Sequence, residues 1–298
     1  MENMTAKVSC FARAYHFRNA QKPIFSDTMA EKLLGEKEYQ MISENMAQGI
    51  SFFAPGFNGS NEEALSFIVD SQLSPSVLAR SAFCERHLKH DVGFGCRQYI
   101  VFAAGYDTFA FRENVPELTV FNLDLPEMIA DRQARVEACD LECQTASHDI
   151  VCDLSKGGLY DALRERGFDP DQKTFGSLLG ISYYLTKADF RNLLSSIEAV
   201  IPKGSALCMD YPCENESMET EKNRELAARA NEQMKARYSY EEMESMLAEC
   251  GFLIYEHLDA AEMTKQYFEE HNAADPAHKM KAPEGVAYLL AVKNVSNI

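Results

Sequence analysis

A glycine turn and an acidic residue are spaced in this sequence as they are in sites that bind a nucleoside. Gly105 ends the apolar run 99–104, and Asp124 ends a second run, 120–123, about twenty residues further on. A glycine after a strand lets the backbone approach a ligand, and a carboxylate can accept hydrogen bonds from both hydroxyls of a ribose. Two simpler interpretations stay open: Gly105 as an ordinary turn glycine, and Asp124 as the cap of a helix beginning at Pro126.

Strands and helices on either side must hold these residues in place. The run 99–104 is rich in strand-forming residues and short enough for a strand buried on both faces. Asp107 and Thr108 can each accept a hydrogen bond from a free backbone N–H, so a helix is expected after the turn. Together with a strand at 120–123, this pattern predicts the first βα unit of a nucleotide-type α/β domain.

Strands and helices alternate through the rest of the chain. We expect further strands in a segment ending near Asp153 and at 175–181, 205–212, 252–257 and 286–292. We expect helices at 126–143, at 159–166, from Thr186 onward and from Ser239 to Gly251. Strands separated by helices predict a parallel sheet with helices on both faces, joined by right-handed crossovers.

Residues 1–97 carry little strand pattern and are predicted to form an N-terminal helical cap. Capping boxes at 28–31 and 60–63 predict two helix starts, and Pro75 should break or restart the second helix. The loop 52–59 holds three aromatic residues, which either line a substrate pocket or pack as a connector. Residues 98–298 are predicted to form a Rossmann-like core that makes one compact unit with the cap.

The segment at about 213–238 is charged and lacks glycine and proline, so it is predicted to be helical. Because it follows the carboxyl end of a strand, it is placed to act as a lid over a site there. A solvated surface helix is the simpler interpretation.

Composition excludes several classes of protein. A net charge of −17 over 298 residues argues against a nucleic-acid partner. The nine cysteines are odd in number and include no CxxC pair, so reduced thiols are expected and a metal site is not. No signal peptide and no run of membrane-spanning length is recognisable, which predicts a cytoplasmic protein.

Short motifs recur in a fixed order along the chain. They are Arg13-Ala14, Asp27, Arg80, AAGYDTFAFR at 103–112, LDLP at 123–126, CDLS at 152–155 and YYL at 183–185. This order resembles the class I S-adenosylmethionine-dependent methyltransferases, and among them the leucine carboxyl methyltransferase and polyketide O-methyltransferase family. The resemblance covers nearly the whole chain. It implies a seven-stranded, mostly parallel sheet with an antiparallel last strand, and helical additions that cap the cofactor.

The resemblance also assigns roles around the glycine turn. Gly105, preceded by Ala104, would pass close to the methionine part of the cofactor. Asp124, followed by Leu125, would bind the ribose hydroxyls.

Further roles follow for the ends of the cofactor. Asp153 and Leu154 would bind the adenine through a carboxylate and a backbone N–H. Arg80 would pair with the cofactor carboxylate, with Arg13 assisting, because a guanidinium binds a carboxylate in a bidentate manner. Arg80 as a surface ion pair, and Asp153 as a helix cap, are the simpler alternatives.

Two positions depart from the family pattern. The usual turn has a second glycine, where this chain has Ala103-Ala104. The family often has a glutamate shortly before its YL pair, where this chain has Leu179. The second change removes a polar contact from the cofactor cleft.

The resemblance implies an O-methyltransferase that transfers a methyl group to a carboxylate or hydroxyl of a small-molecule acceptor. A hydroxyl acceptor would profit from a general base, for which Tyr184, Asp210 and Tyr211 are the candidates after the fourth and fifth strands. Two other functions stay open: an NAD-dependent oxidoreductase, although GxGxxG is absent, and a cofactor-binding protein that does no chemistry. A homo-oligomer also remains open.

Overall fold

A seven-stranded sheet forms the centre of the computed structural model, which describes residues 4–214 and 234–294. Its strands are β1 (Gln98–Phe102), β2 (Thr119–Asp124), β3 (Ala146–Val151), β4 (Thr174–Leu178), β5 (Ala206–Pro212), β6 (Phe252–Leu258) and β7 (Val286–Lys293). Their order is β3-β2-β1-β4-β5-β7-β6, and β7 runs antiparallel to both of its neighbours. The predicted Rossmann-like sheet with an antiparallel last strand is therefore confirmed.

Strand β1 lies in the middle of the sheet, and all five of its residues are buried. Successive side chains of a strand point to opposite faces. Ile100 and Phe102 accordingly enter one core, whereas Tyr99 and Val101 enter another. A strand buried on both faces reads as a continuous apolar run, which is why the sequence shows β1 so clearly.

Helices cover both faces of the sheet. The first face packs against α9 (Leu159–Arg164), α10 (Lys187–Val200) and α12 (Tyr240–Glu249). The second face packs against α6 (Ser74–Gly93), α7 (Phe109–Arg112) and α13 (Ala260–Met263). Helix α8 (Pro126–Ala138) follows β2 and ends earlier than the predicted 143.

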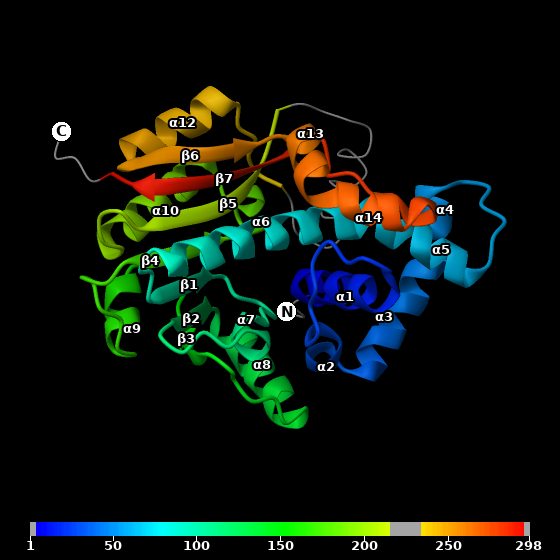
Figure 1. The fold of residues 1–298 in the computed structure, drawn as a ribbon, viewed down its shortest axis with the longest axis horizontal. Coiled ribbons are helices and arrows are strands. Elements are labelled where there is room, and N and C mark those ends of the chain that lie inside the picture. Colours follow the sequence, from blue (N-terminus) through cyan, green and yellow to red (C-terminus); the bar gives the residue numbers. More distant parts are fainter. Residues whose placement is uncertain (1–3, 215–233, 295–298) are drawn as a thin grey trace.

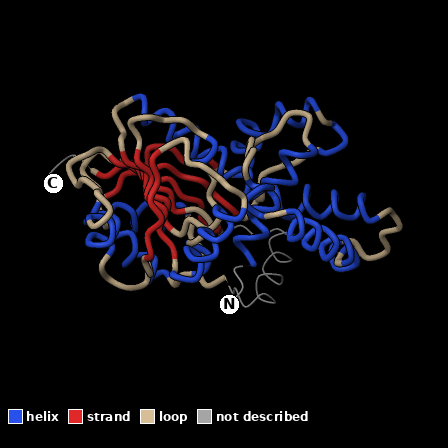
Figure 2. The backbone as a smooth tube through the Cα atoms, turned by 90° about the horizontal axis from the view of Figure 1, so that it is seen from below, coloured by secondary structure: helices blue, strands red, loops and turns tan. Residues whose placement is uncertain are grey.

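A helical part lies beside the sheet, as Figure 2 shows. It contains α1 (Met4–Asn19), α2 (Ala30–Leu34), α3 (Glu36–Gln48), α4 (Ile50–Phe53), α5 (Asn61–Ile68) and the π-helix η1 (Val69–Leu73). These elements enclose a third core, which Tyr106 and Met128 join from the sheet side. Helix α6, whose sequence falls within the predicted cap, instead runs from this helical part across the sheet (Figure 1).

The predicted helix starts have mixed outcomes. Ser60 and Ser239 each form a complete capping box, and Pro75 stands in the first turn of α6 after the π-helix. The capping box at 28–31 is wrong, because Oδ1 of Asp27 accepts hydrogen bonds from the backbone N–H groups of Met29 and Ala30 at 3.2 and 3.0 Å. The buried carboxylate of Asp27, and not the side chain of Thr28, therefore caps this helix.

Several short elements between β6 and β7 were not predicted. After α13 come the π-helix η3 (Thr264–Phe268), α14 (Glu269–Ala274) and the 3-10 turn η4 (Pro276–His278). None is long enough to show a repeating apolar stripe. Most of the predicted lid lies outside the described residues, which stop at 214 and resume at 234.

All nine cysteines lie in the described part of the chain, and all are free thiols. Among the residues that the structure describes, no helix is long and apolar enough to cross a bilayer.

Candidate functional site

The turn after β1 is joined directly to the end of β2. The backbone N–H of Gly105 donates to Oδ2 of Asp124 at 2.8 Å, and the N–H of Leu125 donates to Oδ1 at 2.8 Å. Burial raises the pKa of Asp124, and these two donors oppose the rise. One carboxylate thus fixes the turn and still has free lone pairs directed at a ligand.

Two residues of this turn take left-handed backbone angles. Gly105 has φ 52°, and Ala103 has φ 56°. Glycine adopts this region freely, whereas an L-residue with a Cβ does so at a cost. The backbone at position 103 therefore favours the glycine that the family usually has there. This chain has alanine instead, which adopts the same left-handed conformation.

A cavity of about 440 Å³ opens beside the turn. Six of the predicted cofactor residues line it: Arg13, Arg80, Ala104, Gly105, Asp124 and Leu179. The remaining three, Leu125, Asp153 and Leu154, do not. Oδ1 of Asp153 accepts from the N–H and Oγ of Ser155, and Oδ2 pairs with Lys156 at 2.9 Å, so this carboxylate caps its own loop.

Arg80 reaches the cavity from α6. Its guanidinium donates to Oγ of Ser9 at 3.3 Å and lies 3.7 Å from Oδ2 of Asp210. It packs tightly against Gly180, where a Cβ would come within 2.7 Å of Nη1. Arg80 is not part of a surface ion pair, because its partner Asp210 is fully buried. This pairing holds the guanidinium beside the cavity.

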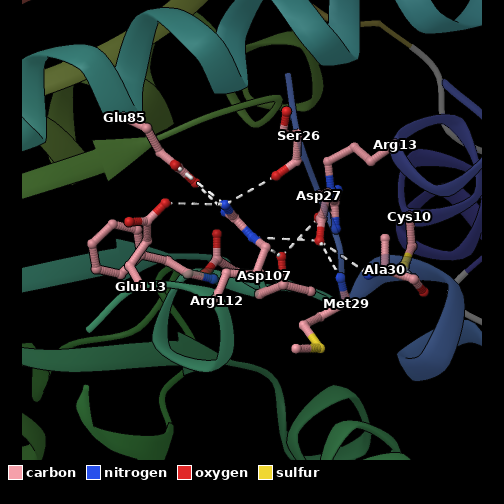
Figure 3. A network of polar contacts seen from close by, with 12 residues as sticks. Cys10, Arg13, Ser26, Asp27, Met29, Ala30, Glu85, Asp107, Arg112 and Glu113 are labelled. Carbon is pink, nitrogen blue, oxygen red and sulfur yellow. Dashed lines mark hydrogen bonds and ion pairs between the residues drawn. The ribbon is translucent and has the colours of Figure 1, made fainter. Parts of the chain in front are cut away.

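Arg13 belongs to a buried network that is centred on Asp27 (Figure 3). Oδ2 of Asp27 accepts from Nε of Arg13 at 2.8 Å and from Oγ1 of Thr108 at 2.7 Å. Nε of Arg112 lies 3.4 Å from Oδ1. Burial raises the pKa of Asp27, but the two guanidiniums lower it more, so it stays below its ordinary value. The network joins α1 to the glycine turn.

A second cavity, of about 1040 Å³ and mostly apolar, adjoins the first. Phe52 and Phe53 of the aromatic segment line it, and so do Cys213 and Met234, which stand near the described ends of the predicted lid. Five residues line both cavities: Thr5, Ser9, Arg80, Gly180 and Tyr184.

Helix α1 forms a wall between the two cavities. Ala6 and Arg13 line the first one only, whereas Val8 lines the second one only. Thr5 and Ser9 face both. Among the described residues, a molecule in one cavity can therefore meet a molecule in the other beside Thr5, Ser9, Arg80, Gly180 and Tyr184.

The three candidate bases lie in different surroundings. Tyr184 lines both cavities. Asp210 lines neither, because its carboxylate accepts from the N–H of Gly180 at 2.6 Å and from the hydroxyl of Tyr183 at 2.9 Å. Tyr211 lines neither and hydrogen-bonds Nε2 of His257 at 2.9 Å. Only Tyr184 stands where an acceptor could meet the cofactor.

Glu85 was not among the site residues predicted from the sequence. Its side chain is 12 % exposed, lines the first cavity and pairs with Arg112. It belongs to none of the recognised motifs. A signal was present nonetheless, because residues 80, 81, 84 and 85 share one face of a helix, and all four line this cavity.

Known proteins resemble this chain over most of its length. The leucine carboxyl methyltransferase family matches residues 6–198. A Bacillus subtilis protein, YktD, is 36% identical over 98% of both chains, and its name makes it a candidate S-adenosyl-L-methionine-dependent methyltransferase. A Mycolicibacterium paratuberculosis protein of similar name is 28% identical over 76% of this chain and 71% of its own.

Solved structures share the fold. A DUF574 family protein from Streptomyces avermitilis superposes with a TM-score of 0.58 at 16% identity, over 83% of this chain and 96% of its own. A candidate methyltransferase from Thermobifida fusca gives 0.55 at 15% identity, over 84% and 95%.

Neither the family nor the relatives support the NAD-dependent or the non-catalytic alternative. The sheet order, the turn joined to Asp124 and the family match agree with one another. The chain belongs to the leucine carboxyl methyltransferase family and is an S-adenosylmethionine-dependent methyltransferase.

Proposed function

We propose that this enzyme transfers a methyl group to an anionic oxygen, a carboxylate or a phenolate, of a largely apolar small molecule. One observation carries the proposal. A cavity beside the glycine turn that is lined by several charged side chains and a larger apolar cavity share a wall, which among the described residues contains one cation, Arg80, and one hydroxyl-bearing ring, Tyr184.

The first cavity fits S-adenosylmethionine. Asp124 offers carboxylate lone pairs for the ribose hydroxyls, and Arg80 and Arg13 offer cations for the carboxylate of the amino-acid end. Gly105 adopts the left-handed angles of the turn without strain, so the backbone of the turn can line the cavity. Asp153 and Leu154, outside this cavity, remain the proposed adenine contacts. When bound, the cofactor supplies a methyl group activated by a positively charged sulfur.

The second cavity fits the acceptor. Its walls include Met46, Phe53, Ile68 and Met280, and such flexible and aromatic side chains adapt to apolar ligands. A small molecule suits a cavity of about 1040 Å³, and the net charge of −17 disfavours nucleic acid.

The shared wall favours an acceptor oxygen that is already negative. A carboxylate is ionised near neutral pH and needs no general base. Arg80 lines both cavities and carries five N–H donors, so it can bind the cofactor carboxylate on one side and orient the acceptor oxygen on the other, while α1 and Tyr184 help to keep water away. For a hydroxyl acceptor, Tyr184 is the one of our three candidate bases that is placed to take the proton.

The test is a turnover assay with S-adenosylmethionine and a panel of aromatic and aliphatic acids, phenols and matched amines. We expect S-adenosylhomocysteine to form with some acids or phenols, and the product to be a methyl ester or ether by mass spectrometry. Transfer to amines alone would contradict the proposed acceptor class. Failure of the protein to bind S-adenosylmethionine at up to millimolar concentration would contradict the site itself.

A further inference from the structure

Helix α6 presents two opposite charges to the cofactor cavity. Arg80 and Glu85 both line it from the same helix face. The amino-acid end of S-adenosylmethionine is itself a zwitterion, with a carboxylate and an ammonium on one carbon. A cation for the first group is already identified in Arg80, so the ammonium needs an anion.

The other carboxylates that line the cavity are already engaged. Asp27 accepts from four donors, two of them side chains, and its carboxylate also lies 3.4 Å from Nε of Arg112. Asp124 accepts from two backbone N–H groups, and Asp107 accepts from the N–H of Phe109 at 2.9 Å. Each of these carboxylates thus holds a backbone N–H of a turn or a helix start, and Asp124 is already assigned to the ribose hydroxyls.

Glu85 differs from these carboxylates, because among the described residues only side chains contact it. Its carboxylate pairs with Arg112, with one contact at 3.4 Å, and lies 3.9 Å from Nζ of Lys89. Each of its oxygens keeps a lone pair for a further donor. The described lining of the cavity holds four cations (Arg13, Arg80, Arg112 and Lys235) and four carboxylates (Asp27, Glu85, Asp107 and Asp124), a balance that suits a zwitterionic amino-acid end.

We propose that Glu85 binds the α-ammonium group of the cofactor and replaces the polar contact that Leu179 cannot make. Leu179 stands on the β4 side of the same cavity, where the family often has a glutamate. In this chain the carboxylate would come from α6, whereas in the family it comes from the end of a strand. This inference rests on the same cofactor site as the proposed function.

A pH dependence follows. Burial raises the pKa of Glu85 to about 7, with Asp107 adding to the rise and Arg112 and Lys89 opposing it. An ammonium binds the ionised form. Affinity for S-adenosylmethionine should therefore fall by about tenfold between pH 7.5 and pH 5.5, as Glu85 takes up a proton.

The experiment is calorimetric titration of wild type and Glu85→Gln with two ligands. One is S-adenosylmethionine, and the other is 5′-methylthioadenosine, which keeps the adenosine but lacks the amino-acid end. We expect Glu85→Gln to weaken S-adenosylmethionine by about tenfold or more and to leave methylthioadenosine unchanged. The pH dependence for S-adenosylmethionine should disappear in the variant.

Glu113→Gln is the matched control, since Glu113 pairs with Lys89 and lies 3.7 Å from Arg112 but does not line the cavity. It should bind both ligands like wild type. Equal affinity of Glu85→Gln and wild type for S-adenosylmethionine would overturn the inference, and so would equal loss of both ligands.

Two further outcomes complete the design. A pH-independent affinity in wild type would also overturn the role of Glu85, and this measurement needs no variant to fold. If wild type binds neither ligand, the result contradicts the cofactor site itself and therefore this inference as well.

Discussion

The glycine turn depends on backbone angles that most residues avoid. Ala103 and Gly105 both have positive φ, and the N–H of Gly105 is held by Asp124. The cost of a left-handed alanine is about 1–2 kcal/mol. The buried strand before the turn and the carboxylate after it hold Ala103 in this conformation.

Ala103→Gly should therefore be tolerated. Relief of strain, about 1–2 kcal/mol, is partly offset by the greater freedom of glycine in the unfolded chain, about 0.4–1 kcal/mol. We expect the free energy of unfolding, measured by urea denaturation, to stay the same or rise slightly, with cofactor affinity retained. A loss above about 1 kcal/mol would show that the backbone of Ala103 is not strained.

At the scale of elements, Asp27 ties α1 and α2 to α7. It caps α2 through Oδ1, holds Arg13 of α1 and accepts from Thr108 at the start of α7. Because its side chain is fully buried, its charge is stabilised by these partners, the N–H of Met29 and the guanidinium of Arg112 instead of by water. The position of α1, and hence the wall between the cavities, depends on this carboxylate.

Asp27→Asn keeps the size of the side chain and removes the charge. The guanidiniums of Arg13 and Arg112 then lose a buried partner, and we expect a loss of about 3 kcal/mol in the free energy of unfolding. Glu31→Gln, which removes an exposed partner of Arg18, should cost less than about 1 kcal/mol. Similar small losses for the two variants would refute the central role of Asp27.

A buried histidine gives the helical part a dependence on pH. Nε2 of His16 accepts a hydrogen bond from the N–H of Ile24 at 2.8 Å, which only the neutral ring can do. Burial, with a smaller effect from His271, lowers the pKa of His16 to about 3. Below about pH 6.5 this histidine therefore binds a proton in the unfolded chain but not in the folded chain. The free energy of unfolding falls as the pH drops below that value.

Between pH 6.5 and pH 5 this group should cost wild type about 2 kcal/mol. His16→Gln offers an acceptor oxygen to Ile24 and does not titrate, so it should not lose this contribution. Urea denaturation of both proteins across this range measures the difference. Parallel pH profiles for the two would contradict the prediction.

Elements were predictable from the sequence where a single pattern decided them. β1 is buried on both faces and reads as a continuous apolar run, and Thr186 and Ser239 cap their helices with local hydrogen bonds. The turns between β6 and β7 were missed because they are too short for an apolar period. The cap at Asp27 was misassigned because tertiary contacts to Arg13 and Thr108 select that carboxylate.

The site was predictable to a similar degree. The Gly105–Asp124 pair has a fixed spacing along the chain, and the motif order supplied Arg80. Glu85 was missed because it belongs to no motif, and although it shares a helix face with Arg80, its pairing with Arg112 depends on how α6 packs against α7. The separation of Asp210 and Tyr211 from the cavities likewise depends on partners distant in sequence.

At the scale of the whole molecule, two cavities meet along α1. Ala6 faces only the first cavity, and Val8 faces only the second. An ideal Cβ on Gly105 would lie 3.4 Å from Cβ of Ala6, so little space is free there. The enzyme can thus hold a polar cofactor and an apolar acceptor on either side of one helix.

Two substitutions on α1 should separate the two ligands. Ala6→Phe should weaken S-adenosylmethionine by about tenfold or more, because the ring enters the first cavity. Val8→Phe should leave cofactor affinity unchanged and raise the KM of the acceptor instead. Calorimetry and steady-state kinetics measure the two effects. Loss of cofactor affinity in Val8→Phe would mean that α1 does not divide the cavities.

A crystal structure of the enzyme with S-adenosylhomocysteine tests the site most directly. We predict that the ribose hydroxyls lie within hydrogen-bond distance of Asp124, that the amino-acid end lies between Arg80 and Glu85, and that the sulfur faces the wall formed by Tyr184 and Arg80. A ligand bound away from Gly105, or a ribose that does not reach Asp124, would contradict the account.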